Sequence, residues 1–205
     1  RSDIVQVPFI SPTNFVNVEK TLDEWGCLWG NTIGTGTGYI LKHPLDQWDD
    51  FECYTFPNPR LPSRFEAIKD AVQRYPHKFV VASLGLTGFS VLTALRGFEN
   101  VLTDLYLNND KLYRLAKLVF EFETKAIEEI SQYRADGVWF FDDWGMEHSL
   151  FVRPDLWRSF FKPLYRAQFD RVHELGMRIF FHSCGYVWPI IPDLIEIGVD
   201  VLNLE

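Results

Sequence analysis

The sequence of 205 residues is poor in cysteine and has no excess of positive charge. Its three cysteines are too few for the disulfide framework of a small secreted domain, so we expect a reducing, cytoplasmic setting. Lys and Arg number 20 against 28 Asp and Glu, which makes the net charge −8. A protein of this charge is not expected to bind nucleic acid or an anionic membrane surface.

Long apolar runs are also missing. None approaches the ~18 residues that a membrane-spanning helix needs. Residues 1–10, RSDIVQVPFI, lack the basic start and the apolar stretch of a secretory signal peptide. We therefore expect no membrane partner.

A phosphate-binding loop is a third absence. Gly34, Gly36 and Gly38 alternate strictly, but neither G-x-x-x-x-G-K-[ST] nor G-x-G-x-x-G occurs around them. No helix N-terminus that could supply a positive end follows the glycines. The segment predicts a twisted hairpin with glycine on one face, and no nucleotide site.

The composition that is present is globular, with 47% hydrophobic and 23% charged residues. The chain is long enough for one domain, which we expect to span residues 1–205. Residues 1–77 are rich in proline and irregular, whereas residues 78–205 follow a regular pattern. Within the first part, residues 63–75 predict a short helix with Ser63 as its N-cap and Glu66 three positions on.

Short apolar runs and amphipathic patterns alternate after residue 77. The runs predict strands at 78–85, 137–144, 177–185 and 199–205, and the patterns predict helices at 109–137, 153–176 and 188–198. We expect Asn109 or Asp110 to cap the first of these helices, and Pro163 to bend or divide the second. Continuous apolar strands that alternate with helices indicate a parallel sheet covered by helices.

Two architectures contain a parallel sheet covered by helices, a doubly wound sheet and a (β/α)8 barrel. The polar residues at the strand ends distinguish between them. Each predicted strand ends on such residues, namely Ser83, Asp142 with Asp143, His182 with Cys184, and Asn203 with Glu205. In a barrel these ends converge on one mouth, where active sites lie, so the pattern favours the barrel. Four units do not close one, and we expect further strands from the N-terminal part or from chain beyond residue 205.

His182 and Cys184 form a candidate zinc half-site at the end of a strand. Residues i and i+2 of a strand point to the same face, and imidazole and thiolate are both good zinc ligands. A third ligand is needed, and Glu205 at the adjacent strand end is the nearest acidic candidate. Cys27 and Cys53 are further possibilities. The structural alternative is a buried histidine beside an inert cysteine.

Asp142 and Asp143 are neighbours on another strand and therefore point to opposite sides. They cannot face each other across the ~5–10 Å that a glycosidase pair requires. We expect one of them to face the mouth while the other caps the loop beyond, although both could be loop caps. Trp144 follows and either floors a pocket or belongs to the core.

Two segments, FFDDWG at 140–145 and HSCG at 182–185, carry a resemblance to a known family. The sequence from Arg134 to Asn203 resembles the uroporphyrinogen decarboxylase superfamily, most of all its corrinoid-dependent methyltransferases. Residues 80–105 are similar to a strand-loop-helix unit that lines the pocket in that family. The resemblance covers residues 78–205 well and 22–77 loosely, and it implies a (β/α)8 TIM barrel.

In the methyltransferases that this sequence resembles, an H-x-C motif and a later cysteine bind zinc. The zinc activates a thiol as methyl acceptor from a methylated corrinoid protein. His182 and Cys184 match the first two ligands, and no cysteine follows them in the sequence. The resemblance thus implies zinc, a methylated corrinoid (methylcobalamin or a corrinoid protein) and a small-molecule methyl acceptor.

The true decarboxylase of the family uses no metal and carries an M-R-Q-A-G-R segment, which is absent here. Three functions follow as hypotheses: a zinc-dependent methyltransferase, a decarboxylase-like carboxy-lyase acting on a tetrapyrrole, and a non-catalytic barrel that binds a corrinoid partner. For the first we expect Asp142 or Asp143 to orient the acceptor. We expect Asp142 and Cys184 to open on one cavity, with Thr87 or Phe89 nearby and Trp144 as a further substrate-binding residue.

Overall fold

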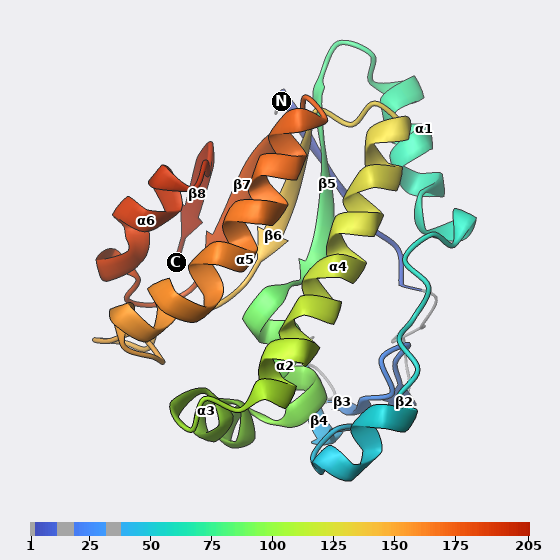
Figure 1. The fold of residues 1–205 in the computed structure, drawn as a ribbon. Helices are drawn as coiled ribbons and strands as arrows, with labels where there is room; N and C mark the ends of the chain where they lie inside the picture. The colour runs from blue at the N-terminus through green and yellow to red at the C-terminus, as the bar shows by residue number, and fades with distance from the viewer. Residues whose placement is uncertain (1–2, 12–18, 32–37) are drawn as a thin grey trace.

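The computed structural model describes residues 3–11, 19–31 and 38–205 (Figure 1). Five parallel strands form its main sheet, in the order β1-β5-β6-β7-β8. These strands are β1 (Ile4–Pro8), β5 (Phe79–Leu86), β6 (Gly137–Phe141), β7 (Arg178–Ser183) and β8 (Val201–Leu204). Each strand pairs with the sheet strand that precedes it along the chain, as successive β/α units of a barrel do.

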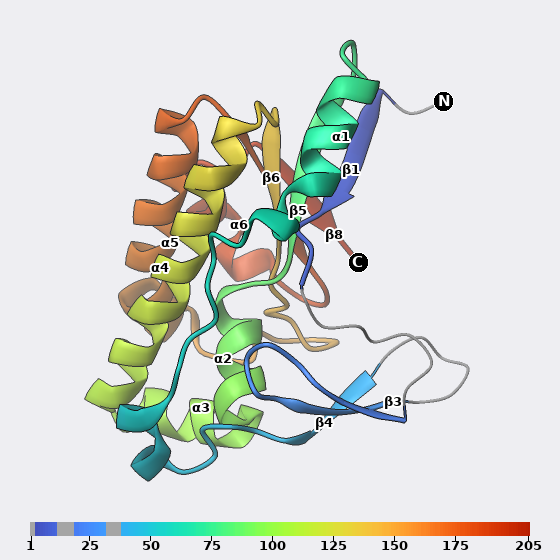
Figure 2. The ribbon, with the colours of Figure 1, turned by 90° about the vertical axis from the view of Figure 1, so that its right-hand side faces the viewer.

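A helix connects each strand of this sheet to the next. The connecting helices are α1 (Glu66–Arg74), α4 (Asp110–Gln132), α5 (Pro154–Glu174) and α6 (Ile191–Glu196). Local signals set their starts: the Asn109 side chain accepts a hydrogen bond from the backbone N–H of Lys111, and Pro154 occupies the first turn of α5. The long helices α4 and α5 lie side by side over one face of the sheet (Figures 1 and 2).

Alternation along the strands separates the two faces of the sheet. Phe140 and Phe181 are completely buried, and their rings pack on the aromatic rings of α5. Trp139 and Phe180 point the other way and contact each other. On this second face an aromatic row runs along the sheet and ends at the ring of His182, which contacts Phe141. The side chain of His182 therefore lies on the face of the sheet that α4 and α5 do not cover.

A small antiparallel sheet lies near the carboxyl ends of the parallel strands, beside α2 (Gly88–Arg96) (Figure 2). Its strands are β2 (Lys20–Leu22), β3 (Leu28–Asn31) and β4 (Gly38–Lys42). The pairing of β3 with β4 confirms the predicted hairpin. A Cβ atom added to Gly38 would lie 3.1 Å from the carbonyl oxygen of Gly30, so glycine permits this close pairing. Gly34 and Gly36 lie outside the described residues.

Short helices complete the chain. They are η1 (Trp48–Cys53), η2 (Pro62–Arg64), α3 (Phe98–Tyr106) and η3 (Trp188–Ile190). None of the helices in the described part of the chain combines the length and the apolar character that crossing a membrane requires.

Three local predictions need correction. The N-terminal part is less irregular than expected: the helix predicted at residues 63–75 is confirmed as α1, and the part also supplies β1, one of the further strands that the barrel needs. Ser63 does not cap α1, since it lies within η2 and the N-cap position falls on Phe65. Pro163 does not divide α5, which runs unbroken from Pro154 to Glu174. Packing of the long helix on the sheet outweighs the one hydrogen bond that the proline removes.

Candidate metal centre

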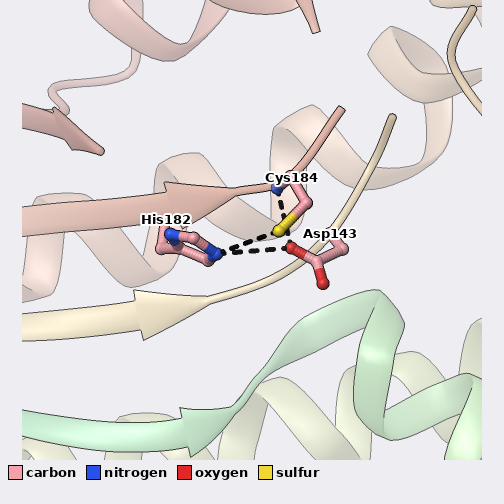
Figure 3. A group of neighbouring side chains, drawn as sticks. All are labelled: Asp143, His182 and Cys184. Carbon is pink, nitrogen blue, oxygen red and sulfur yellow. Dashed lines mark hydrogen bonds and ion pairs between the residues drawn. The ribbon is translucent and has the colours of Figure 1, made fainter. Parts of the chain in front are cut away.

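Three side chains meet where β6 and β7 end (Figure 3). The Cys184 sulfur lies 3.3 Å from Nε2 of His182, and Oδ1 of Asp143 lies 3.7 Å from the same nitrogen. One ligand atom from each residue lies within 4.8 Å of the other two. Sequence spacing alone predicted the first pair, whereas the third member comes from the neighbouring strand.

The ring of His182 is held in one orientation by β8. Its Nδ1 lies 2.7 Å from Oδ1 of Asn203, the residue directly opposite it in the pairing of β7 with β8. A carbonyl oxygen can only accept a hydrogen bond, so Nδ1 carries a proton, and Nε2 is the ring nitrogen that can offer a lone pair to a metal ion. This is the arrangement of metal-binding histidines, whose second nitrogen donates to a fixed oxygen.

The loops after β6 and β7 hold Asp143 against Cys184. The backbone N–H of Cys184 donates to Oδ1 of Asp143 over 2.8 Å, and the N–H of Gly145 donates to the carbonyl of Cys184. Gly145 and Gly185 make the close approach possible. A Cβ on Gly145 would lie 2.4 Å from the carbonyl carbon of Gly185, too close for any larger residue. Glycine in both loops therefore permits the contact that brings the cluster together.

Burial raises the pKa of the Cys184 thiol, and the carboxylates of Asp143 and Glu205 raise it further. Metal binding must therefore release the thiol proton. One imidazole nitrogen, one sulfur and one carboxylate oxygen make a donor set that fits zinc, for which three protein ligands and an open fourth position are typical of catalytic sites. The side chain of Asp143 is 50% exposed, so the group is accessible from outside.

Asp142 lies on the opposite side of the strand end and is completely buried. It accepts hydrogen bonds from the backbone N–H groups of Phe89 and Ser90, from the Ser90 hydroxyl and from the Tyr165 hydroxyl. The expectation that Asp142 opens on a cavity with Cys184 is wrong, because adjacent strand residues alternate and Asp143 takes the outward position. Asp142 instead caps the N-terminus of α2.

Glu123 is a second buried carboxylate at this helix end, and the sequence analysis missed it. It accepts hydrogen bonds from the backbone N–H of Gly88 over 2.7 Å and from the Gln168 side chain over 2.8 Å. Burial raises the pKa of Glu123 to about 8 and that of Asp142 to about 7, although their hydrogen bonds act in the opposite direction. The sequence signal that could have identified Glu123 is its position on the buried face of the amphipathic helix α4.

The remaining predicted site residues lie around the cluster without joining it. Thr87 and Trp144 are almost completely buried; the Thr87 hydroxyl donates to a backbone carbonyl, and Trp144 stacks on Phe89. The carbonyl of Glu205 accepts the N–H of Gly185, but its carboxylate is not part of the three-residue group. The two other cysteines of the chain, Cys27 and Cys53, are also outside that group.

A cavity of about 460 Å³ opens beside Asp143. Its wall combines β4, α2, the start of α3 and the loop that follows β6. Phe89 lines this cavity, as expected for a residue of the pocket. The metal-ligand group and the cavity therefore share one wall residue, Asp143.

The chain matches a family model described as uroporphyrinogen decarboxylase (URO-D) over residues 26–205. Among solved structures it resembles a methyltransferase from Methanosarcina mazei, with a TM-score of 0.72 and 21% identity. That match covers 87% of this chain and 52% of the methyltransferase, so the chain spans about half the length of that protein. Together, the family match and the structural likeness confirm the predicted (β/α)8 barrel class, of which the described strands form an open part.

A mutant of the Ostrinia furnacalis Group II chitinase catalytic domain 2 also matches, at 16% identity over 90% of this chain and 40% of that one. Its TM-score of 0.38 is too low to support a conclusion. No curated protein sequence matches the chain.

Proposed function

The chain belongs to the uroporphyrinogen decarboxylase family, and from this premise we propose that it carries the metal site of a zinc-dependent methyltransferase. The reaction moves a methyl group from a methylated corrinoid to a small thiol acceptor. The observation that carries the proposal is the group of His182, Cys184 and Asp143, whose ligand atoms lie within 4.8 Å of one another. The fixed orientation of the His182 ring supports it, because Nε2 already faces the other two ligands.

Each residue of the group has a distinct part in this proposal. His182 binds through Nε2, Cys184 through its deprotonated sulfur, and Asp143 through a carboxylate oxygen. Asp143 replaces Glu205 as the third ligand from this chain. A bound zinc ion would lower the pKa of an acceptor thiol, so that the thiol stays deprotonated at neutral pH.

Asp142 takes a positioning role in the proposal. It is buried and holds the first turn of α2, whose Ser90 hydroxyl also accepts a weak hydrogen bond of 3.4 Å from the Asp143 backbone N–H. Asp142 therefore acts on the site through the helix and the loop rather than by contact with the acceptor.

Metal analysis of the protein expressed from its complete gene tests the proposal. We expect about one zinc per chain, with most of it lost in Cys184→Ser and in Asp143→Asn. Cys53→Ser is the matched control, because Cys53 is an exposed free cysteine outside the ligand group, and we expect it to keep its zinc. Methyl transfer from methylcobalamin to a thiol should fall with the zinc content.

Three outcomes would overturn the proposal in different ways. Equal zinc in wild type and both variants, with only a lower melting temperature, would leave His182 and Cys184 as core residues. A protein without zinc that releases carbon dioxide from a carboxylated tetrapyrrole would instead be the decarboxylase-like enzyme. A protein that binds methylcobalamin without any turnover would be the non-catalytic binding barrel.

A further inference from the structure

The cavity beside Asp143 is lined in part by aromatic rings. Of the described residues that line it, five carry aromatic rings, namely Trp29, Tyr39, Phe89, Phe98 and Phe151. Two of these side chains are well exposed, Tyr39 at 54% and Phe98 at 41%. The face of an aromatic ring carries partial negative charge and attracts cations.

Three polar groups of the same wall have already used their protons. The Ser90 hydroxyl donates to Asp142, the Thr93 hydroxyl to the carbonyl of Ser90, and Nδ1 of His43 to the carbonyl of Ala94. The hydroxyl oxygens of Ser90 and Thr93 thus keep lone pairs that can accept a further hydrogen bond. Such a wall favours a ligand that is positively charged.

The charges at the cavity also favour a positively charged ligand. Asp143 contributes a half-exposed carboxylate, and none of the described lining residues is Lys or Arg. An anionic ligand such as a sulfonate or a carboxylate would lose its hydration here without gaining a charged partner, which is costly. A cation gains both the carboxylate and the aromatic rings.

We propose that this cavity binds an organic ammonium group, and that this group is the non-reacting end of the methyl acceptor. The second half of this statement rests on the proposed methyl transfer, whereas binding of the ammonium group does not. The acceptor is then a thiol that carries an ammonium group, bound with its cation beside Asp143 and its sulfur toward His182 and Cys184.

Calorimetric titration of the protein as purified, with whatever metal it holds, tests the binding. The probes are choline, its uncharged isostere 3,3-dimethylbutan-1-ol, and the anion 2-mercaptoethanesulfonate. We expect choline to bind most tightly, the isostere more weakly because it lacks the charge, and the sulfonate not at all. Equal affinity for choline and the isostere, or tighter binding of the sulfonate, would overturn the proposal.

Single substitutions locate the site. Tyr39→Leu and Phe98→Leu should each weaken choline binding by about two- to fivefold, the range for an exposed cation–aromatic contact. Tyr39→Phe keeps the ring and should keep the affinity. Tyr113→Leu is the control, since Tyr113 is 47% exposed on α4 and does not line the cavity. Unchanged affinity in both leucine variants would place the cation elsewhere and refute this site.

A comparison of acceptors separates this inference from the proposed function. Thiocholine and 2-mercaptoethanesulfonate both present a thiol but carry opposite charges at the other end. Because the proposed cavity binds the ammonium group, a zinc-loaded methyltransferase should methylate thiocholine in preference to the sulfonate. Methyl transfer that prefers the sulfonate would refute the acceptor class and leave the proposed function standing. Choline binding in a protein that holds no zinc would refute the function and leave the cation site standing.

Discussion

Asn203 is the residue that prepares His182 for metal. The 2.7 Å contact between its Oδ1 and Nδ1 of the ring selects the tautomer in which Nε2 is unprotonated. Removal of a hydrogen-bond partner of this kind lowers the metal affinity by about 10- to 100-fold. The contact exists because the two residues stand opposite each other in the pairing of β7 with β8.

We predict that Asn203→Leu weakens zinc binding by about 10- to 100-fold, because the ring of His182 loses its fixed orientation. Asn203→Asp retains an oxygen acceptor at the same place and should bind zinc nearly as well as wild type. Competition with a chromophoric chelator measures the affinity of all three proteins. If the leucine variant bound zinc as tightly as the aspartate variant, the orienting role of Asn203 would be excluded.

At the scale of a single element, α2 is attached to the sheet by two buried carboxylates. Asp142 and Glu123 accept the backbone N–H groups of its first turn, which are the donors that a helix leaves without internal partners. Gly88 begins this helix with φ of +48°, and a Cβ there would lie 2.4 Å from the Asp142 carboxylate. The helix therefore depends on carboxylates from other elements rather than on a local cap.

These carboxylates make stability depend on pH. The folded-state pKa of Glu123 is about 8 and that of Asp142 about 7, both above their ordinary values of 4.5 and 3.8. At a pH between the ordinary pKa and the folded-state pKa of each group, the folded state binds more protons than the unfolded state does. The free energy of unfolding should therefore fall as the pH rises from about 5 to about 8.

We predict that Glu123→Gln reduces this fall, because glutamine does not titrate. Its carbonyl can still accept the N–H of Gly88. Its amide can donate to Oε1 of Gln168, which is buried without a partner in wild type, once the Gln168 amide turns over to present that oxygen instead of Nε2. The variant should be more stable than wild type at pH 8. Urea unfolding at several pH values provides the comparison. Parallel stability profiles for the two proteins would mean that Glu123 is ionised throughout.

For the whole molecule, the described strands form an open sheet rather than a closed barrel. Among the described residues, β1 pairs only with β5 and β8 only with β7, so each leaves one edge without a strand. Apolar side chains stand at these edges, with Val201 40% and Leu204 41% exposed. Open edges with apolar side chains promote pairing between chains.

We predict that residues 1–205 on their own associate as the protein concentration rises. Val201→Lys should weaken the association, because a lysine on an edge strand opposes pairing. Leu107→Lys is the control, since Leu107 is 73% exposed just after α3 and lies on neither edge. Sedimentation velocity follows the mass of each protein. A wild-type chain that stays monomeric at every concentration would contradict this account of the edges.

The sequence by itself determined the β/α alternation and the joint position of His182 and Cys184, whereas the barrel class followed from the polar strand ends and the family resemblance. The first two features are local: apolar runs mark strands, and a spacing of two places side chains on one face. The hairpin before residue 43 and the N-cap at Asn109 were also local signals, and the structure confirms both. The general outline of the fold was therefore readable from patterns within single elements.

Only the tertiary structure decided which carboxylate joins that pair. Pairing of β6 with β7 places Phe141 opposite His182, so Asp143, two residues on, arrives opposite Cys184 while Asp142 turns into the core. A register shift of one residue would exchange the two aspartates, and no single-strand pattern reveals the register between strands. The capping of α2 by Glu123 depends likewise on how α4 packs, since 35 residues separate Glu123 from Gly88.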